Sequence, residues 1–261
     1  MAINKESQSF TFIFSIVMVV VVATVLALAA LGLKEPQQEN QKQEKMQNIL
    51  ASIQVIVDRS EASAEFGNYI KQRLTLSSQG EVVSTSEGPV QSLSADGKEA
   101  FESDAFNIDI KKQFRDQSLS PEDKKFPLFI CEKDGKTSYV VPMVGTGLWG
   151  PIWGFLALGP DMNTVIGATF DHKTETPGLG AEINQGWFQD PFVGDKIFDD
   201  NGEFVSIKVI KGGADAIDEH GVDAITGGTI TSVGVSNMLE NTLSVYVPYF
   251  KHNADIASIQ Q

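Results

Sequence analysis

The sequence predicts an α+β protein: a single N-terminal transmembrane helix followed by a soluble domain with an antiparallel sheet and flanking helices. Three observations lead to this prediction. An uncharged apolar run fills the first part of the chain, short β-type segments separated by turn residues begin at Pro127, and a helical repeat of apolar residues follows Thr231. Strands and helices that are grouped along the chain, and do not alternate, are typical of α+β domains.

The apolar run is the first predicted element. No charged side chain occurs between Ser7 and Leu33, and residues 10–33 are nearly all Val, Ala, Leu, Ile and Phe. As a helix this stretch is roughly 36 Å long, which exceeds the ~30 Å hydrocarbon core of a bilayer. A cleavable signal peptide, cut near Ala27-Leu28-Ala29, is the alternative, but its apolar part usually has only ~7–15 residues. We therefore expect a retained membrane anchor.

The charges around the run leave the side of the membrane open. Lys5 precedes the predicted span, and Lys34, Lys42 and Lys45 follow it. A positive-inside count would place the soluble domain in the cytoplasm, but long domains cross the membrane largely regardless of charge.

The composition excludes several classes of protein. The 261 residues include 20 Lys and Arg against 34 Asp and Glu, which gives a formal net charge of -14. A nucleic-acid-binding protein would need a basic patch. The single cysteine, Cys131, excludes a disulfide framework or a Cys-ligated metal site within one chain. We predict no acid–base catalytic residue and no metal site.

The region after the anchor is predicted to be partly helical. Apolar residues at helical spacing indicate one helix over about residues 37–57 and a second, short helix that includes Phe66, Ile70 and Leu74. Residues 79–122 are rich in Ser, Gly and Asp and predict irregular structure. The whole chain thus divides into a tail at 1–9, a transmembrane helix at 10–33, a membrane-proximal region at 34–125 and a β-rich C-terminal region at 126–261.

The C-terminal region contains three turn signals between short apolar segments. Such turns join the two strands of a hairpin. From Thr231 the repeat becomes helical, and Pro248 is expected near the end of this helix. The predicted hairpins are 128–132 with 138–144 around Asp134-Gly135, 152–158 with 164–170 around Gly159-Pro160-Asp161, and 196–198 with 204–210 around Asn201-Gly202; the predicted buried helical face is Val235, Met238, Leu239, Leu243 and Tyr246.

The segment Thr226-Gly-Gly-Thr-Ile-Thr-Ser232 leads into the last helix. Two adjacent glycines let the backbone bend sharply and let another group approach. Thr231 or Ser232 is a suitable N-cap, and a helix N-terminus offers free N–H groups and a positive dipole end to a phosphate. Thr229 would present its hydroxyl beside this anion site. A plain glycine turn before a capped helix is the alternative.

Two other glycine-containing segments resemble this one in style. Residues 145–154 contain Trp149 and Trp153, which form either part of the core or the wall of a site for a planar ligand. Residues 174–180 (Thr-Glu-Thr-Pro-Gly-Leu-Gly) place Glu175 among glycines and hydroxyls, where a solvated loop carboxylate is the alternative. His172 is expected to be a surface or hydrogen-bonded residue and not a ligand.

The sequence Asp223-Ala-Ile-Thr-Gly-Gly-Thr229 resembles the flavinylation motif of the FMN-binding domain family, roughly Asp-x-x-Ser/Thr-Gly-Ala-Thr. In that family a flavin transferase joins FMN through its phosphate to the last threonine, so the resemblance implies Thr229 as the acceptor. Gly228 stands where the family usually has Ala. The segments at 147–158 and 172–180 resemble the NqrC subunits of the sodium-translocating NADH:quinone reductases, and less closely the RnfG subunits of the Rnf-type ferredoxin:NAD oxidoreductases.

The resemblance implies a redox subunit whose region 126–261 binds FMN. It implies electron relay from NADH towards ubiquinone within a sodium-exporting complex of six subunits, which include the flavin-bearing B subunit. It places the protein in the bacterial inner membrane with its soluble domain on the extracytoplasmic side. An Rnf-type subunit and a cofactor-free anchored binding module are the alternatives. The implied FMN-binding residues are Thr229, as the covalent acceptor, with Asp223, Thr226, Gly227, Gly228, Thr231, Ser232, Trp149, Glu175, Thr176 and Leu179.

Overall fold

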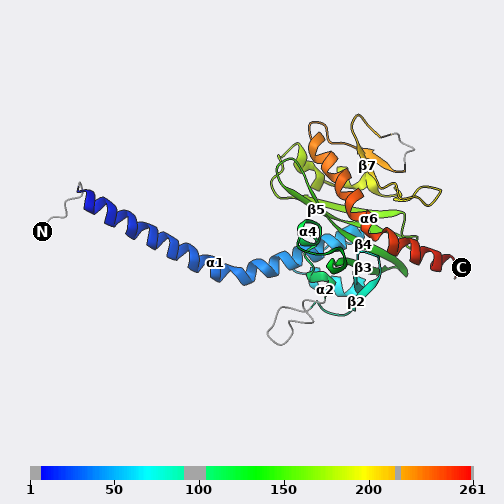
Figure 1. Cartoon of the computed structure of the whole chain (residues 1–261), viewed down its shortest axis with the longest axis horizontal. Helices are drawn as coiled ribbons and strands as arrows, with labels where there is room; N and C mark the ends of the chain where they lie inside the picture. Colours follow the sequence, from blue (N-terminus) through cyan, green and yellow to red (C-terminus); the bar gives the residue numbers. More distant parts are fainter. Residues whose placement is uncertain (1–6, 91–103, 215–218, 260–261) are drawn as a thin grey trace. The chain divides into compact units, whose positions relative to one another are not determined.

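The structure is a computed structural model, and it describes residues 7–90, 104–214 and 219–259 (Figure 1). The chain divides into two compact units, Met1–Lys45 and Met46–Gln261, which are described separately.

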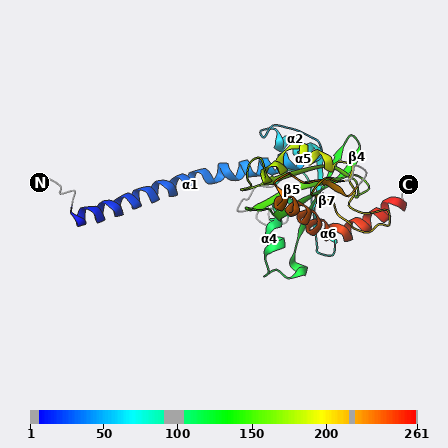
Figure 2. The same cartoon turned by 90° about the horizontal axis from the view of Figure 1, so that it is seen from above.

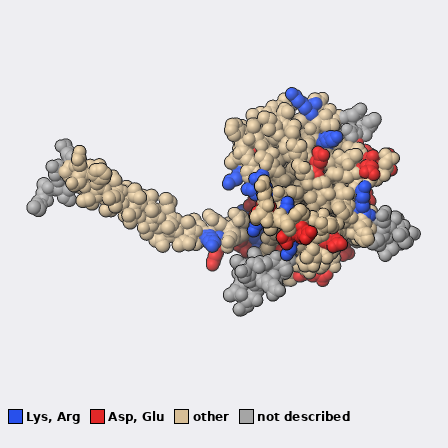
Figure 3. Space-filling model, viewed as in Figure 1, with Lys and Arg blue, Asp and Glu red and all other residues tan. Residues whose placement is uncertain are grey.

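The first unit is dominated by helix α1 (Gln8–Ser52), whose last turns belong to the second unit. Its apolar part has the length and composition needed to cross a membrane, and none of its most apolar window is buried. Figure 3 shows this part of the helix without Lys, Arg, Asp or Glu. A helix that is apolar all round and unburied is stable in lipid, where its backbone groups are satisfied internally. The helix therefore has the character of a membrane anchor.

The second unit is built on a six-stranded antiparallel sheet with the order β2-β1-β3-β4-β5-β6. The first two predicted hairpins are confirmed as the pairs β3–β4 and β5–β6. Asp134 and Gly135 both adopt positive φ angles, 52° and 73°, as a two-residue turn of type I′ requires. The strands are β1 (Ile70–Leu76), β2 (Val82–Ser86), β3 (Phe126–Lys133), β4 (Lys136–Thr146), β5 (Pro151–Leu158) and β6 (Val165–His172).

The prediction of a second helix through Phe66, Ile70 and Leu74 is only partly correct. Helix α2 (Ala62–Tyr69) contains Phe66, but Ile70 and Leu74 lie on strand β1. A register shift in the β1–β3 pairing after Ile70 places these two side chains in different cores. A spacing of four residues fits both a helix and a strand that is irregular and buried on both faces, so the local pattern could not separate them.

The third predicted hairpin is only partly correct. Phe198 and Phe204 form an antiparallel bridge around Asn201-Gly202, and the N–H of Val205 donates to the carbonyl of Ile197 at 3.0 Å, but residues 196–198 and 204–207 form no regular strands. Strand β7 (Lys208–Ile210) pairs in parallel with β8 (Gly221–Asp223), so this small second sheet is not antiparallel.

Each face of the large sheet carries its own core. Helix α6 (Thr229–Ile259) packs on one face, chiefly against β4, and lies along the sheet in Figure 2. Its predicted apolar face, from Val235 to Tyr246, is buried there. The end of α1, from Met46, and helix α2 pack on the other face. Helix α6 continues past Pro248 to Ile259, so the prediction that it ends near Pro248 is wrong.

Short elements connect the main ones. They are α4 (Ile110–Arg115), α5 (Gly186–Gln189) and the 3-10 helices Ala105–Asn107, Pro121–Asp123, Gly180–Asn184 and Asp190–Phe192.

A buried ion pair fixes one edge of the sheet. The Arg73 guanidinium on β1 donates to both carboxylate oxygens of Asp104, at 2.9 and 2.7 Å, and to the carbonyl of Gly88 at 2.7 Å. Asp104 also accepts from the N–H of Phe106 at 2.9 Å. Both charged side chains are almost fully buried.

We predict that Asp104→Asn lowers the free energy of unfolding by about 3–5 kcal/mol, because it leaves the buried Arg73 charge uncompensated. Urea unfolding of the full chain, followed by tryptophan fluorescence, measures this. Glu87→Gln is the matched control, since Glu87 is exposed and accepts one bond from Gln72; it should change stability by less than about 0.5 kcal/mol. Equal effects of the two substitutions would contradict the prediction.

Candidate functional site

The three glycine-containing segments singled out in the sequence meet at one cavity of about 380 Å³. One segment is the β4–β5 loop, the second follows β6, and the third is the turn into α6. Most residues implied by the resemblance line this cavity, namely Trp149, Glu175, Thr176, Leu179, Gly227, Gly228, Thr229 and Thr231. Leu148, Gly180 and Ile230 also line it and were not predicted.

Three of the implied residues lie outside the cavity lining. Asp223 ends β8, and its carboxylate accepts from the N–H of Ala214 at 2.6 Å. Thr226 is exposed. Ser232 is buried, and its hydroxyl accepts from the N–H of Ile225 at 3.1 Å. Ser232 therefore closes the turn that precedes α6.

The predicted N-cap is corrected by the structure. Helix α6 begins at Thr229, so Thr231 and Ser232 lie within its first turn with their side chains directed inward. The turn ahead of the helix is made by Gly227, which has φ +79°, and Gly228, whose N–H donates to the carbonyl of Ile225. The positive φ angle favours glycine at position 227, and a Cβ atom there would also lie 2.8 Å from the tip of the Leu179 side chain, which would have to move.

The start of α6 offers free backbone donors to the cavity. Within the described part of the chain, the N–H groups of Thr229, Ile230 and Thr231 donate to no acceptor. The N–H of Ser232 is already used, since it donates to the carbonyl of Gly228 at 2.9 Å. Free N–H groups and the positive end of the helix dipole favour an anion at this end of α6, whose first residue is Thr229.

Glu175 joins the three segments. It is only 5 % exposed, so the alternative of a solvated loop carboxylate is wrong. One carboxylate oxygen accepts from the N–H of Trp149 at 2.8 Å, and the other accepts from the Thr231 hydroxyl at 2.6 Å. Backbone donors at Leu148 and Gly150 also face the carboxylate.

The surroundings of Glu175 keep it ionised. Burial alone would raise the pKa of its carboxyl group, but the hydrogen bonds from Thr231 and from the β4–β5 loop outweigh burial and lower it below the ordinary value. His172 is hydrogen-bonded, as expected, because its Nδ1 atom accepts from the N–H of Glu175 at 3.3 Å.

The rim of the cavity is apolar and exposed. Trp149 is 66 % exposed and Ile230 is 59 % exposed, and Leu148 and Leu179 are also exposed. Apolar side chains that gather around a cavity are typical of a ligand or partner site. Trp153 lies on β5 and does not line the cavity.

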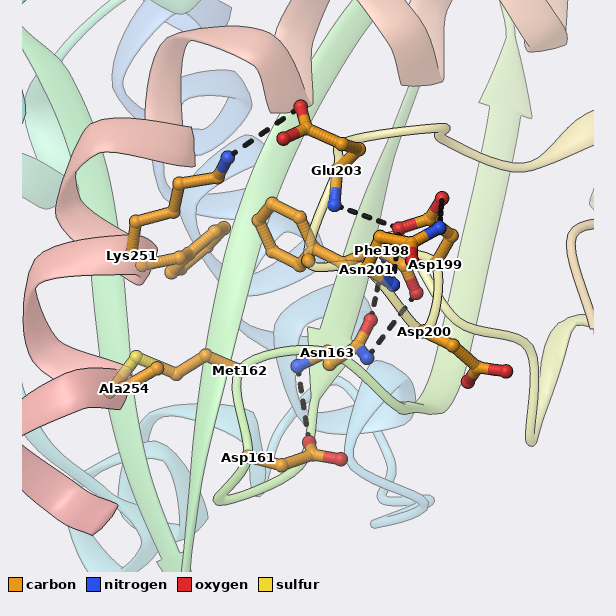
Figure 4. A pocket seen from close by; sticks show the side chains of 12 residues that line it. Asp161, Met162, Asn163, Phe198, Asp199, Asp200, Asn201, Glu203, Lys251 and Ala254 are labelled. Atoms are coloured by element: carbon orange, nitrogen blue, oxygen red, sulfur yellow. Dashed lines mark hydrogen bonds and ion pairs between the residues drawn. The ribbon is translucent and has the colours of Figure 1, made fainter.

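A second cavity, of about 470 Å³, lies by the loops at 161–163 and 198–203 and the end of α6 (Figure 4). Its carboxylates hold local turns: Asp161 accepts from Asn163 and Thr164, and Asp199 accepts from Asn201 and Glu203. In the part of the chain that the structure describes, no group of three or more His, Cys, Asp and Glu side chains is placed to hold a metal ion. The acidic side chains that line this second cavity do not suit an anionic ligand.

Comparison with known proteins defines the class first. The model of the FMN-binding domain family matches residues 147–244, which include every residue that lines the cavity. Relatives cover nearly the whole chain. The C subunit of the Na(+)-translocating NADH-quinone reductase of Neisseria meningitidis serogroup B is 34 % identical over 251 residues, which is 94 % of each chain. That of Haemophilus ducreyi is 33 % identical over 230 residues, 85 % of this chain and 86 % of its own.

The solved structures agree. The crystal structure of the same subunit from Parabacteroides distasonis superposes with a TM-score of 0.71 at 38 % identity, over 84 % of this chain and 96 % of that chain. The chain belongs to the NqrC family, the C subunits of the Na(+)-translocating NADH-quinone reductases. This confirms the resemblance carried by the three glycine-containing segments.

We predict that the stability contributed by Glu175 depends on pH. Because the pKa of Glu175 is lower in the folded than in the unfolded chain, its contribution is complete above the ordinary value of 4.5 and is lost as the pH falls through the folded value. Glu175→Gln should therefore be less stable than the wild type at pH 7, and the difference should shrink between about pH 5 and pH 3. Urea unfolding across this range measures the difference; a gap that stays constant would refute the prediction.

Proposed function

We propose that this chain carries FMN, covalently attached to Thr229, and relays electrons from NADH towards quinone within the Na(+)-translocating NADH-quinone reductase. The observation that carries the proposal is the position of Thr229. It is the first residue of α6 and lines the cavity together with Ile230 and Thr231, and among the described residues the N–H groups of these three have no acceptor. A phosphoester on this hydroxyl would lie at the helix N-terminus, where anions are stabilised.

The cavity fits the two ends of FMN. Its volume of about 380 Å³ is within the ~300–1,000 Å³ common for ligand sites. The N–H groups at the start of α6 would hold the phosphate, and Trp149, Leu148 and Leu179 would contact the flavin ring. FMN supplies the redox chemistry, and the chain supplies binding, orientation and electrostatics.

Covalent attachment requires a maturation step by a flavin transferase. The Thr229 oxygen bonds to phosphorus as the phosphoanhydride bond of an activated flavin nucleotide breaks. The hydroxyl proton passes to a base of the transferase, and a nucleoside monophosphate leaves. The Thr229 side chain is partly exposed at the cavity, which gives the transferase access to it. Gly228, in place of the usual Ala, keeps this turn free of side chains.

The exposed rim would face the partners of this chain in a complex of six subunits. Electron transfer to a second flavin, carried by the B subunit of that complex, requires a close approach to the ring. The exposed Trp149 and Ile230 mark the side from which that approach is open. We assign residues 10–33 to the membrane span, 34–125 to the membrane-proximal region and 126–261 to FMN binding.

The soluble domain is proposed to lie outside the cytoplasm of a bacterial cell, anchored in the inner membrane. Covalent attachment makes physical sense there, because FMN that dissociated would be lost by dilution.

We predict that Thr229→Ala abolishes the flavin fluorescence that survives on a denaturing gel, since the acceptor oxygen is gone. Thr229→Ser should retain fluorescence because it keeps the hydroxyl. Thr85→Ala, on the exposed strand β2, is the matched control and should match the wild type. The full chain is expressed together with a flavin transferase for this test. Undiminished fluorescence in Thr229→Ala would reject Thr229 as the acceptor.

We predict that Asp200→Cys is labelled by a membrane-impermeant maleimide in intact cells. Asp200 is exposed on the soluble domain, and this domain is proposed to lie outside the cytoplasm. The native Cys131 gives little background, since it is buried and burial raises its pKa to about 12. Asn4→Cys, before the span, should react only after lysis. The reverse pattern would place the domain in the cytoplasm.

A further inference from the structure

Glu175 connects all three segments of the cavity through its hydrogen bonds. We propose that Glu175 is a positioning residue: its carboxylate fixes the β4–β5 loop against the first turn of α6 and keeps a negative charge at the cavity that makes a bound flavin harder to reduce. The second half of this proposal rests on the proposed FMN site, whereas the first half concerns the polypeptide alone.

The hydrogen bonds of Glu175 bridge long distances along the chain. Its partner Trp149 is 26 residues earlier and its partner Thr231 is 56 residues later. All of these partners are donors, and an ionised carboxylate is a group that only accepts. A glutamine could still accept from the backbone through its one oxygen and donate its NH₂ group to the Thr231 hydroxyl oxygen, but its hydrogen bonds would be neutral. The carboxylate differs in accepting through both oxygens and in making these hydrogen bonds charge-assisted, which roughly doubles their strength.

The neighbouring backbone is shaped around this carboxylate. A Cβ atom at Gly147 would lie 2.6 Å from one carboxylate oxygen of Glu175, and a Cβ at Gly180 would lie 2.5 Å from the other. A Cβ at Gly180 would also lie very close to the Thr231 hydroxyl. Two loops thus come into contact with the carboxylate through glycine. A side chain at either glycine would displace the Glu175 carboxylate or the loop.

The same carboxylate has an electrostatic consequence. It lines the cavity together with Trp149 and Thr229, so its charge is close to any group bound there. Reduction places additional negative charge or a proton on a flavin ring, and a nearby fixed anion opposes negative charge. If Glu175 only held the loops together, its loss would change the order of the loops and leave the midpoint potential of the flavin unchanged. The two halves of the proposal are therefore separable.

The first test uses the full chain in detergent, produced without a flavin transferase. Hydrogen exchange at pH 7 should be at least about tenfold faster at the amides of Leu148–Gly150 in Glu175→Gln than in the wild type, because their charge-assisted hydrogen bonds to the carboxylate are replaced by weaker bonds to a neutral amide oxygen. Glu182→Gln is the matched control: Glu182 is in the same region and accepts one N–H, from Gly178 at 3.0 Å, which a glutamine oxygen can still accept.

Thr231 provides an independent variant if Glu175→Gln does not fold. Thr231→Val removes one donor to the carboxylate and should also speed exchange at the β4–β5 loop, whereas Thr231→Ser should restore the wild-type rate. Unchanged exchange in Glu175→Gln, or in Thr231→Val where that variant must serve, overturns the positioning role.

The second test uses the chain loaded with flavin. The midpoint potential of the flavin should be more positive in Glu175→Gln than in the wild type and unchanged in Glu182→Gln. Faster exchange with an unchanged potential would overturn the electrostatic half. Failure of the proposed attachment at Thr229 can be told apart from failure of the proposal for Glu175. The first would appear as covalent flavin retained in Thr229→Ala, whereas the exchange experiment on Glu175 requires no flavin.

Discussion

The hydrogen bonds to one buried carboxylate connect the parts of this site that are most distant in the sequence. Glu175 accepts from the β4–β5 loop and from the first turn of α6, and these two elements belong to different segments of the fold. Two glycines of the site pack directly against this carboxylate. A Cβ atom at Gly147 or Gly180 would overlap with its oxygens. The glycines of the segments at 145–154 and 174–180 are therefore explained by close packing as much as by contact with a ligand.

Close contacts between α6 and strand β4 hold the site on the sheet. Helix α6 lies close to the end of β4: a Cβ at Gly234 would be 2.5 Å from the Thr146 carbonyl oxygen, and a Cβ at Gly145 would be 2.7 Å from the Met238 side chain. The start of α6 and the loop after β4 are thus held at a defined separation. The opposite face of the same sheet carries the end of α1, so residues 46–52 of this helix belong to the core of the domain that carries the site.

Local sequence was sufficient where local physics decides the structure. The Asp134-Gly135 turn and the buried face of α6 were predictable, because turn chemistry and helical periodicity act over a few residues. Strand β1 and the parallel pairing of β7 with β8 were not predictable, since they depend on partners far along the chain. For the same reason Glu175 suggested a solvated carboxylate: its donors at Trp149 and Thr231 become neighbours only in the folded chain.

The site separates two tasks that a flavin carrier must combine. The start of α6 offers N–H groups to a phosphate, while the exposed rim at Trp149 and Leu179 offers apolar surface to a ring. Under the proposed attachment, a bond at the phosphate end would leave the ring free of any covalent constraint, and the two loops that contact Glu175 would set its environment. Attachment and tuning would then depend on different residues of one cavity, and a change in one need not disturb the other.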